Sequence, residues 1–154
     1  MNHKKVSFQE LFPLIEEKMK TGESFSFLAF GTSMLPFIRN GKDLVTLSPC
    51  SKNLKKNDVI FYRRTSGQFV LHRITKVRKN GELWLCGDNQ ILIEKEIFPE
   101  QVIAILTKLE RDGKEIALHS FPLSFYFLYL PIRRFVYRVL IFIKRMLKRV
   151  FNIK

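Results

Sequence analysis

Residues 58–77 read DVIFYRRTSGQFVLHRITKV, and this stretch decides the fold class of the chain. Two segments rich in β-branched and aromatic residues, Asp58–Arg64 and Gln68–Val77, lie on either side of the turn signal Ser66-Gly67. Short apolar segments of this kind, joined by a glycine-containing turn, are typical of β-hairpins. The stretch therefore predicts two adjacent antiparallel strands.

Five more short apolar segments surround this hairpin along the chain. They are separated by further turn signals, Asn40-Gly41, Asn80-Gly81 and Asp112-Gly113. Seven short strands at such spacing predict a mainly β domain, either a twisted β-sandwich or a partly closed barrel. The five segments are Ser24–Phe30, Asp43–Leu47, Leu83–Gly87, Val102–Glu110 and Lys114–Leu118.

Both ends of the chain have helical patterns instead. Ser7 and Glu10 have the spacing of a capping box, and apolar residues recur at helical spacing over Phe8–Lys20, before Gly22. A short N-terminal helix is therefore expected to cap the core. The predicted organisation is an N-terminal helix in residues 1–23, a β domain in 24–119, and an apolar, basic tail in 120–154.

The charge of the chain is concentrated in that tail. The 154 residues carry a net charge of +13, and residues 116–154 hold eight basic residues and no acidic one. The apolar run Phe121–Ile132 is bracketed by Pro122 and Pro131, which is short of the roughly 20 residues that a spanning helix needs. Residues Arg133–Phe151 combine a wide apolar face with bordering arginines and lysines, the pattern of a helix in the membrane interface.

The tail thus predicts peripheral or monotopic association of its helix with an anionic membrane surface. The sequence does not indicate which face of the membrane it binds. The alternative is a helix docked on the domain or on a partner, which is disfavoured because docking needs no exclusively positive charge. Nucleic-acid binding is also disfavoured, since the aromatic residues lie among aliphatic ones. Cys50 and Cys86 form no CxxC pair, and the histidines and carboxylates lack ligand spacing, so neither a metal nor an organic cofactor is expected.

Three residues have side chains suited to acyl-transfer chemistry. Ser33 follows a predicted strand within Gly31-Thr32-Ser33-Met34-Leu35-Pro36, a turn that can expose a nucleophile. A serine hydroxyl needs a base, and a neutral imidazole such as that of His72 serves near pH 7. A carboxylate such as Asp88 orients the imidazole. Taken singly, each residue also fits an ordinary turn or strand position.

The order of four motifs narrows these alternatives. Ser33-Met34-Leu35-Pro36 is followed by Gly41-Lys42-Asp43-Leu44-Val45, then by Leu71-His72-Arg73-Ile74, and then by Gly87-Asp88-Asn89. This order resembles the serine endopeptidases of the signal-peptidase and LexA-like group, over about residues 25–105. His72 stands where bacterial signal peptidases and LexA-like autoproteases have a lysine, so the chain is most similar to the archaeal and endoplasmic-reticulum-type branch.

The resemblance implies a role for each residue of these motifs. Gly31 stands where many signal peptidases have a hydroxyl residue, so the oxyanion hole is expected to rest on backbone N–H groups. The implied roles are Ser33 as nucleophile, His72 as general base, Asp88 as orienting acid, Thr32 and Gly31 near the oxyanion hole, Met34 and Pro36 in substrate binding, and Glu94 as candidate second acid.

These features predict a membrane-associated serine endopeptidase that cleaves an extended peptide or protein substrate. Two other functions remain open. One is a catalytically silent lipid-binding module on the same fold. The other is a soluble LexA-like autoprotease, which is disfavoured because position 72 is not a lysine.

Overall fold

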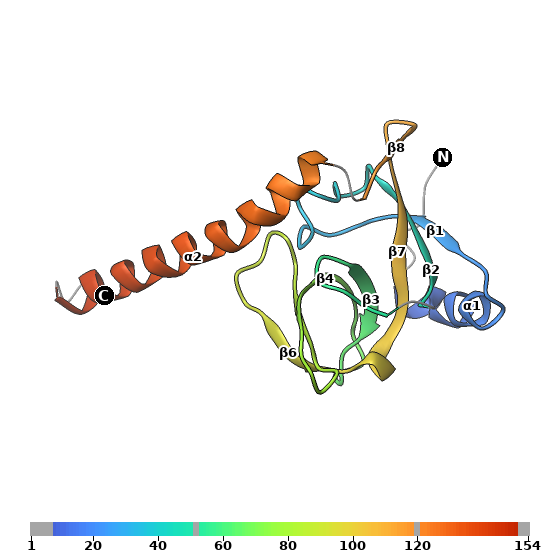
Figure 1. Ribbon diagram of the computed structural model, residues 1–154, viewed down its shortest axis with the longest axis horizontal. Coiled ribbons are helices and arrows are strands. Elements are labelled where there is room, and N and C mark those ends of the chain that lie inside the picture. The colour runs from blue at the N-terminus through green and yellow to red at the C-terminus, as the bar shows by residue number, and fades with distance from the viewer. Residues whose placement is uncertain (1–7, 51–52, 119–120, 151–154) are drawn as a thin grey trace.

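The computed structural model describes residues 8–50, 53–118 and 121–150, with side chains described for 12–50, 53–118 and 126–149. The middle of the chain forms β-strands, with one helix near each end (Figure 1). The elements are α1 (Phe8–Lys20), β1 (Phe25–Leu28), β2 (Leu44–Pro49), β3 (Val59–Arg63), β4 (Phe69–Val77), β5 (Leu83–Cys86), β6 (Glu94–Ile97), the 3₁₀ turn η1 (Pro99–Gln101), β7 (Val102–Arg111), β8 (Lys114–Ile116) and α2 (Phe121–Val150).

All strands belong to one antiparallel sheet of eight strands. Their order is β1-β2-β7-β3-β4-β5-β6, and β8 pairs with β7 off this path. The sheet is open, with β1 and β6 at its two ends. The mainly β prediction is confirmed, and the arrangement is one open sheet rather than two packed sheets.

The central strand β3 is buried on both of its faces. Val59 and Phe61 belong to one apolar cluster, and Ile60 and Tyr62 belong to a second. Because side chains alternate along a strand, each face of β3 supports a separate core. This explains why residues 59–62 read as an unbroken apolar run.

Strand β6 was not predicted from the sequence. Its residues are Glu-Lys-Glu-Ile, and only Ile97 is buried. The strand forms because Leu83 of β5 pairs with Ile97 and Leu85 pairs with Glu94. A four-residue edge strand with three charged residues has no apolar pattern by which to recognise it.

Helix α1 has the predicted bounds, and Ile15 anchors it in the core. Gly22, with φ of +81°, follows the helix, and its N–H donates to the carbonyl of Met19. The proposed capping box of Ser7 and Glu10 lies outside the residues whose side chains are described. Pro13 lies inside the helix.

Helix α2 is longer than the helix that the sequence predicts. The helix is continuous over 30 residues and includes Pro131, whereas the helix expected from the sequence begins at Arg133. Proline removes one backbone hydrogen bond and usually ends or kinks a helix. The proximal part of α2 packs on the β domain, and its distal part projects beyond it (Figure 1).

The segment that follows Ser33 is fixed by a buried carboxylate, Asp43. Its side chain is fully buried and forms ion pairs with Arg39, at 2.8 Å, and with Arg111, at 2.7 Å. It also accepts the backbone N–H of Arg39, while Arg111 donates to the carbonyl of Phe37. These bonds hold the chain between the candidate nucleophile and β2.

This arrangement makes stability depend on acid pH. Burial raises the pKa of Asp43, but the hydrogen bonds from Arg111 and Arg39 outweigh burial and lower the pKa to about 2, from a usual value of 3.8. A carboxyl with a depressed folded-state pKa stabilises the fold above its unfolded-state pKa and loses that contribution as pH falls through the folded value.

Asp43→Asn is therefore expected to lower the free energy of unfolding by at least about 2 kcal/mol at neutral pH. The difference from the wild type should shrink between about pH 4 and pH 2. Urea unfolding at several pH values measures it, with the exposed Asp112→Asn as control. A difference that stays constant down to pH 2 would contradict this account of Asp43.

Candidate active site

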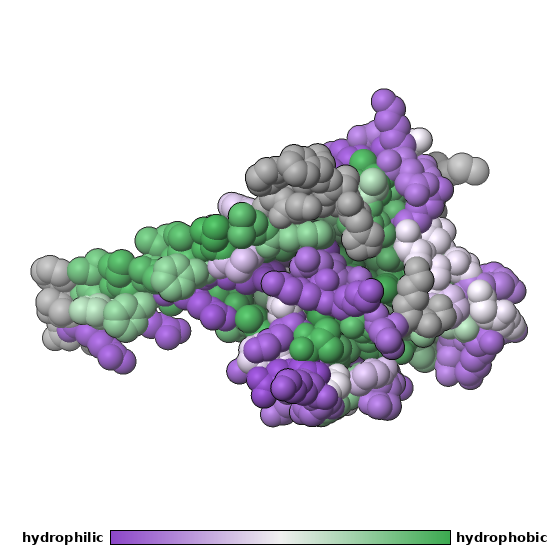
Figure 2. Space-filling model, in the orientation of Figure 1, coloured by the Kyte–Doolittle hydropathy of each residue, from purple (hydrophilic) through white to green (hydrophobic). Residues whose placement is uncertain are grey.

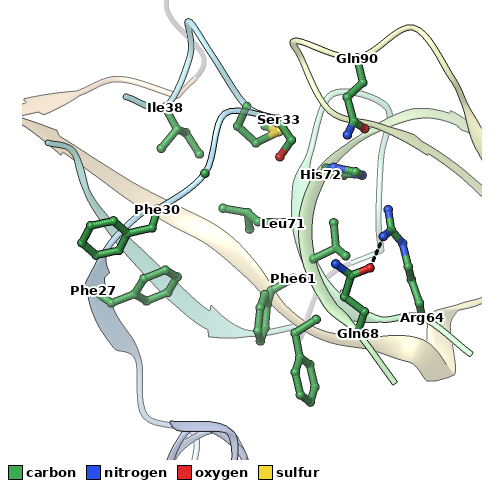
Figure 3. Close-up of a pocket in the computed structure, with 14 residues that line it drawn as sticks. Phe27, Phe30, Ser33, Ile38, Phe61, Arg64, Gln68, Leu71, His72 and Gln90 are labelled. Atoms are coloured by element: carbon green, nitrogen blue, oxygen red, sulfur yellow. Dashed lines mark hydrogen bonds between the residues drawn. The ribbon is translucent and has the colours of Figure 1, made fainter. Parts of the chain in front are cut away.

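Ser33 and His72 line one cavity at the surface of the β domain. The cavity has a volume of about 240 Å³. In Figure 3 the Ser33 side chain lies between the His72 ring and Ile38, with Gln90 beside the ring. Aromatic and aliphatic side chains form most of the remaining wall: Phe27, Phe30, Met34, Ile38, Phe61, Phe69, Val70 and Leu71.

The Gly87-Asp88-Asn89 segment packs directly on the backbone of Ser33. The Asn89 N–H donates to the Ser33 carbonyl at 2.8 Å. A Cβ atom at Gly87 would lie 2.6 Å from the same carbonyl oxygen, closer than real Cβ atoms approach backbone. Position 87 therefore requires glycine because of its contact with Ser33, and this contact joins two motifs that are 54 residues apart.

His72 is oriented by Glu94 in the structure. The imidazole is 1% exposed, and its Nδ1 atom lies 3.0 Å from Oε1 of Glu94 and 3.4 Å from the Tyr62 hydroxyl. An Nδ1–H that donates to a carboxylate leaves Nε2 as the acceptor nitrogen. Since His72 lines the cavity, its Nε2 is the nitrogen able to accept a proton from a group bound there.

Burial lowers the pKa of His72, and Arg64 lowers it further, whereas Glu94 and Asp88 raise it. The net shift is downward, so the imidazole is neutral at neutral pH. Burial raises the pKa of Glu94, but hydrogen bonds from Arg64 and Tyr62 outweigh burial and the net pKa is lowered. A neutral imidazole beside an ionised carboxylate is the charge state that a general base requires.

Glu94 is itself held by two neighbours. Oε2 accepts hydrogen bonds from the Tyr62 hydroxyl, at 2.8 Å, and from Nε of Arg64, at 2.7 Å. Arg64 also forms an ion pair with Oε1. Tyr62 and Arg64 were not identified as site residues from the sequence, which shows them only as members of the predicted strand Asp58–Arg64.

Asp88 lies in a different ion pair. Its carboxylate accepts Nε of Arg73 at 2.9 Å and Nη2 at 2.8 Å, and both side chains are almost fully buried. The Arg73 guanidinium is 4.4 Å from the centre of the Phe37 ring and 4.9 Å from that of Phe127 in α2. Asp88 was expected to orient His72. Its hydrogen bonds are instead made to Arg73, and Glu94 occupies the orienting position.

Helix α2 supports the loop that contacts Ser33. Arg133 donates to the Asp88 carbonyl at 2.7 Å, and Arg134 donates to the carbonyls of Gly87 and Gln90 at 3.3 Å. Arg138 donates to the carbonyl of Ile91 at 3.2 Å. A docked helix was expected to need no exclusively positive charge. This expectation is wrong for the proximal part of α2, where arginines donate hydrogen bonds to loop carbonyls.

The remaining predicted residues divide into two groups. Gly31, with φ of +118°, and the buried Met34 line the cavity, and the Gly31 N–H donates to Oδ1 of Asn40 at 2.9 Å. Thr32 and Pro36 are exposed and are not among the described residues that line it. The described residues contain no group of three or more histidine, cysteine, aspartate or glutamate side chains able to hold a metal ion.

No protein-family model matches this chain, and the comparison with curated proteins finds no match. The arrangement comprises a serine hydroxyl, a buried imidazole, an ionised carboxylate beside its Nδ1 atom, and an apolar cavity in front. These are the components of nucleophilic acyl transfer.

Proposed function

We propose that the chain is a serine endopeptidase in which Ser33 is the nucleophile, His72 the general base and Glu94 the orienting acid. The observation that carries this proposal is the shared cavity of Ser33 and His72, together with the contact of 3.0 Å between His72 Nδ1 and Glu94. The order of the sequence motifs, which resembles the signal-peptidase group, supports the same chemistry. Asp88 is assigned a positioning role through Arg73.

In this mechanism Ser33 Oγ attacks the carbonyl carbon of the scissile peptide bond while His72 Nε2 accepts the Oγ proton. Glu94 stabilises the resulting imidazolium. The tetrahedral intermediate then collapses, the C–N bond breaks, and Nε2 returns the proton to the leaving amine. Water, deprotonated by the same nitrogen, then attacks the acyl carbon; the C–Oγ bond breaks and Nε2 returns the proton to Ser33 Oγ.

The backbone near Ser33 can supply the oxyanion hole. Among the described residues, the N–H groups of Thr32 and Ser33 form no hydrogen bond. Backbone donors directed at a developing oxyanion commonly contribute about 10²- to 10³-fold to kcat. In this proposal these backbone N–H groups take the role of the hydroxyl side chain that is absent at Gly31.

The substrate we propose is an extended peptide. Strand β1 is at one end of the sheet and pairs only with β2 among the described strands, and the chain runs from β1 to Ser33. An edge strand can pair with an extended ligand through main-chain hydrogen bonds. A small side chain before the cut is the preference implied by the resemblance, and the apolar cavity accepts the adjacent part of the peptide.

The experiment that tests this function presents the full chain with a mixture of peptides, both in solution and on anionic vesicles, and identifies products by mass spectrometry. We expect cleavage within a restricted set of sequences. Absence of any cleavage under both conditions, with the protein shown to be folded, would favour the catalytically silent lipid-binding module. Self-cleavage alone would favour the autoprotease.

The pH profile tests the role of Glu94. The wild-type rate is expected to rise with pH through an apparent pKa below 6.5, because only neutral His72 accepts a proton. Glu94→Gln removes the carboxylate that raises the pKa of His72, so the acidic limb should move to lower pH. Since the imidazolium also loses its counter-charge, kcat should fall by about 10²- to 10⁴-fold.

The matched control is Glu96→Gln, an exposed residue of the same strand. Initial rates between pH 4.5 and 8 distinguish the two variants. A kcat for Glu94→Gln within threefold of the wild-type value would exclude Glu94 as the orienting acid.

Membrane association is the second part of the proposal. Among the described helices, none is both long enough and apolar enough to cross a bilayer. Helix α2 nevertheless exposes an unbroken apolar face, visible along the projecting helix in Figure 2. We define the α2 apolar face as Leu128, Tyr129, Ile132, Phe135, Val136, Val139, Leu140, Phe142, Ile143, Met146 and Leu147.

The basic residues of α2 lie on the opposite side of the helix. At 100° per residue, Arg133, Lys144 and Lys148 and their basic neighbours fall outside the sector occupied by the α2 apolar face. An apolar sector bordered by lysine and arginine suits insertion at the surface of an anionic membrane. In the orientation we propose, the β domain lies on the solvent side of the helix.

Phe135→Ser/Phe142→Ser is expected to weaken binding to anionic vesicles by at least about tenfold, because each exposed phenylalanine contributes about 1.5–3 kcal/mol on burial. Both side chains are more than 60% exposed, so the fold should be unaffected. Vesicle co-sedimentation measures the change. The control is Val77→Ser/Phe98→Ser, which removes exposed apolar residues from the β domain; equal losses in both variants would contradict a specific role of α2.

A further inference from the structure

A second cavity lies between α2 and the β domain. It has a volume of about 310 Å³, and none of the described residues lines both this cavity and the one at Ser33. We call it the α2 groove. Its apolar lining consists of Ile74 and Trp84 from the sheet, Ile93 from the loop before β6, and Phe127, Leu130, Pro131 and Phe135 from the helix.

The α2 groove is strongly cationic. Lys56, Lys76 and Arg138 line it, and no carboxylate is found among its described lining residues. Within the part of the chain that the structure describes, none of these three forms an ion pair. Arg138 donates only to a carbonyl, that of Ile91. Arg134, which also lines the α2 groove, likewise donates to carbonyls, so four positive charges in this concave site have no carboxylate partner among the described residues.

Trp84 lines the α2 groove and is surrounded by basic side chains. Lys76 and Lys95 lie 5.1 and 4.6 Å from its ring, and Arg78 lies 5.4 Å away. Its indole N–H donates to Glu82, which also pairs with Arg78 and does not line the α2 groove. A tryptophan with an apolar ring and a satisfied N–H, surrounded by cations, is typical of the interface between lipid and water.

The α2 groove also joins the α2 apolar face. Phe135 belongs to both, and its side chain is 68% exposed. An occupant with an anionic end and an apolar end matches both halves of this surface. A free inorganic anion would leave the apolar lining uncovered, and a nucleic acid would leave the adjoining apolar face in water.

We propose that the α2 groove binds one anionic phospholipid. Lys56, Lys76 and Arg138 hold the phosphate group, and an acyl chain packs against Phe127, Leu130 and Phe135 before it continues along the α2 apolar face. Basic clefts beside membrane-associated helices bind anionic head groups in this way. The bound lipid fixes the orientation of the domain on the membrane, a step beyond adsorption of α2 alone.

The test uses a short-chain lipid, dihexanoyl phosphatidylglycerol, below its micelle-forming concentration, so that binding needs no bilayer. Trp84 is the single tryptophan of the chain and lies in the α2 groove, so its fluorescence reports occupancy. We expect a saturable change with one lipid per protein. Dihexanoyl phosphatidylcholine should bind at least tenfold more weakly.

The variant Lys56→Gln/Lys76→Gln should raise the midpoint of this titration at least tenfold. The matched control is Lys42→Gln/Lys114→Gln, which removes the same charge from exposed positions outside the α2 groove and should leave the midpoint unchanged. Comparison of midpoints rather than amplitudes avoids the direct effect of Lys76 on Trp84.

Several results would overturn the proposal. They are a non-saturable titration, equal midpoints for the two lipids, equal losses in the two double variants, or an equal midpoint for inorganic phosphate, which would indicate a simple anion site. Tighter binding of an acidic peptide or an oligonucleotide than of the lipid would show that the α2 groove binds a different class of ligand. Ser33→Ala is expected to bind the lipid normally, so failure of the lipid site and failure of the peptidase function are distinguishable.

Discussion

Ser33→Ala is expected to abolish peptide cleavage, with a fall in kcat of at least about 10⁴-fold. Removal of Oγ eliminates the acyl-enzyme route, and no other described hydroxyl side chain lines the cavity. The side chain of Ser33 is only partly buried and forms no hydrogen bond among the described residues, so its loss should leave the fold intact. Initial rates with the peptides identified for the wild type measure the change.

The control for this variant is Ser66→Ala, in the exposed turn between β3 and β4. It removes a hydroxyl far from His72 and should have wild-type kinetics. Circular dichroism and the midpoint of thermal unfolding should agree among the three proteins. Retention of more than one-tenth of the wild-type rate by Ser33→Ala would remove Ser33 from the mechanism.

Asp88→Ala is expected to destabilise the fold by about 3–5 kcal/mol. Arg73 is 2% exposed, and loss of its partner leaves a guanidinium buried without a carboxylate. Two kinds of contact remain for Arg73: a hydrogen bond to the Asn57 carbonyl, at 2.7 Å, and cation–π contacts with the rings of Phe37, Tyr126 and Phe127. Neither supplies negative charge, so the cost of the unpaired cation is not offset. Urea unfolding at neutral pH measures it.

A double-mutant cycle separates the ion pair from simple loss of packing. Arg73→Met/Asp88→Ala should be more stable than Asp88→Ala alone, because the buried cation is removed together with its partner. Additive losses would contradict a coupled pair. If Asp88→Ala were as stable as the wild type and yet inactive, Asp88 rather than Glu94 would be the acid of the mechanism.

The two acids thus have different expected phenotypes. Glu94→Gln should change the pH profile and kcat, since Glu94 contacts the base directly. Asp88→Ala should lower the free energy of unfolding. It should also disturb the adjacent loop, in which the Asn89 N–H donates to the Ser33 carbonyl. Comparison of both variants by unfolding and by kinetics assigns each carboxylate to its role.

The strands were predictable wherever apolar residues dominate them. Residues 59–62 and 69–74 are buried or half-buried, and their β-branched and aromatic residues made the hairpin evident. Helix α1 was predictable from its period and from Gly22. Strand β6 was not, because its pairing with β5 depends on tertiary position, and only Ile97 of its four residues contributes to a core.

The candidate site was predictable in its motifs but not in its pairings. The sequence indicated Ser33, His72, Asp88 and Glu94 together, and no spacing rule determines which carboxylate lies beside the imidazole. The assignment depends on β6, which carries Glu94 to the Nδ1 side of His72, and on Arg73, which binds Asp88. Both contacts are long-range in sequence.

In the C-terminal tail, the sequence predicted the helix but not the contacts of its basic residues. Its composition predicted an amphipathic helix, and the structure has one, with most of the exposed apolar residues in the α2 apolar face. The separate roles of its cations could not be read from composition. Arg133, Arg134 and Arg138 are bound to loop carbonyls, whereas no acceptor is described for Lys144 or Lys148.

The most direct test of the central claim is acid-quenched mass spectrometry of the chain mixed with an activated ester of a substrate peptide. Peptide esters acylate serine peptidases rapidly, so an acyl-enzyme accumulates before steady state. We predict a burst of leaving group stoichiometric with enzyme and an added acyl mass on the proteolytic fragment that contains Ser33, both absent from Ser33→Ala. Hydrolysis without an adduct, or an adduct on another residue that persists in Ser33→Ala, would contradict the account.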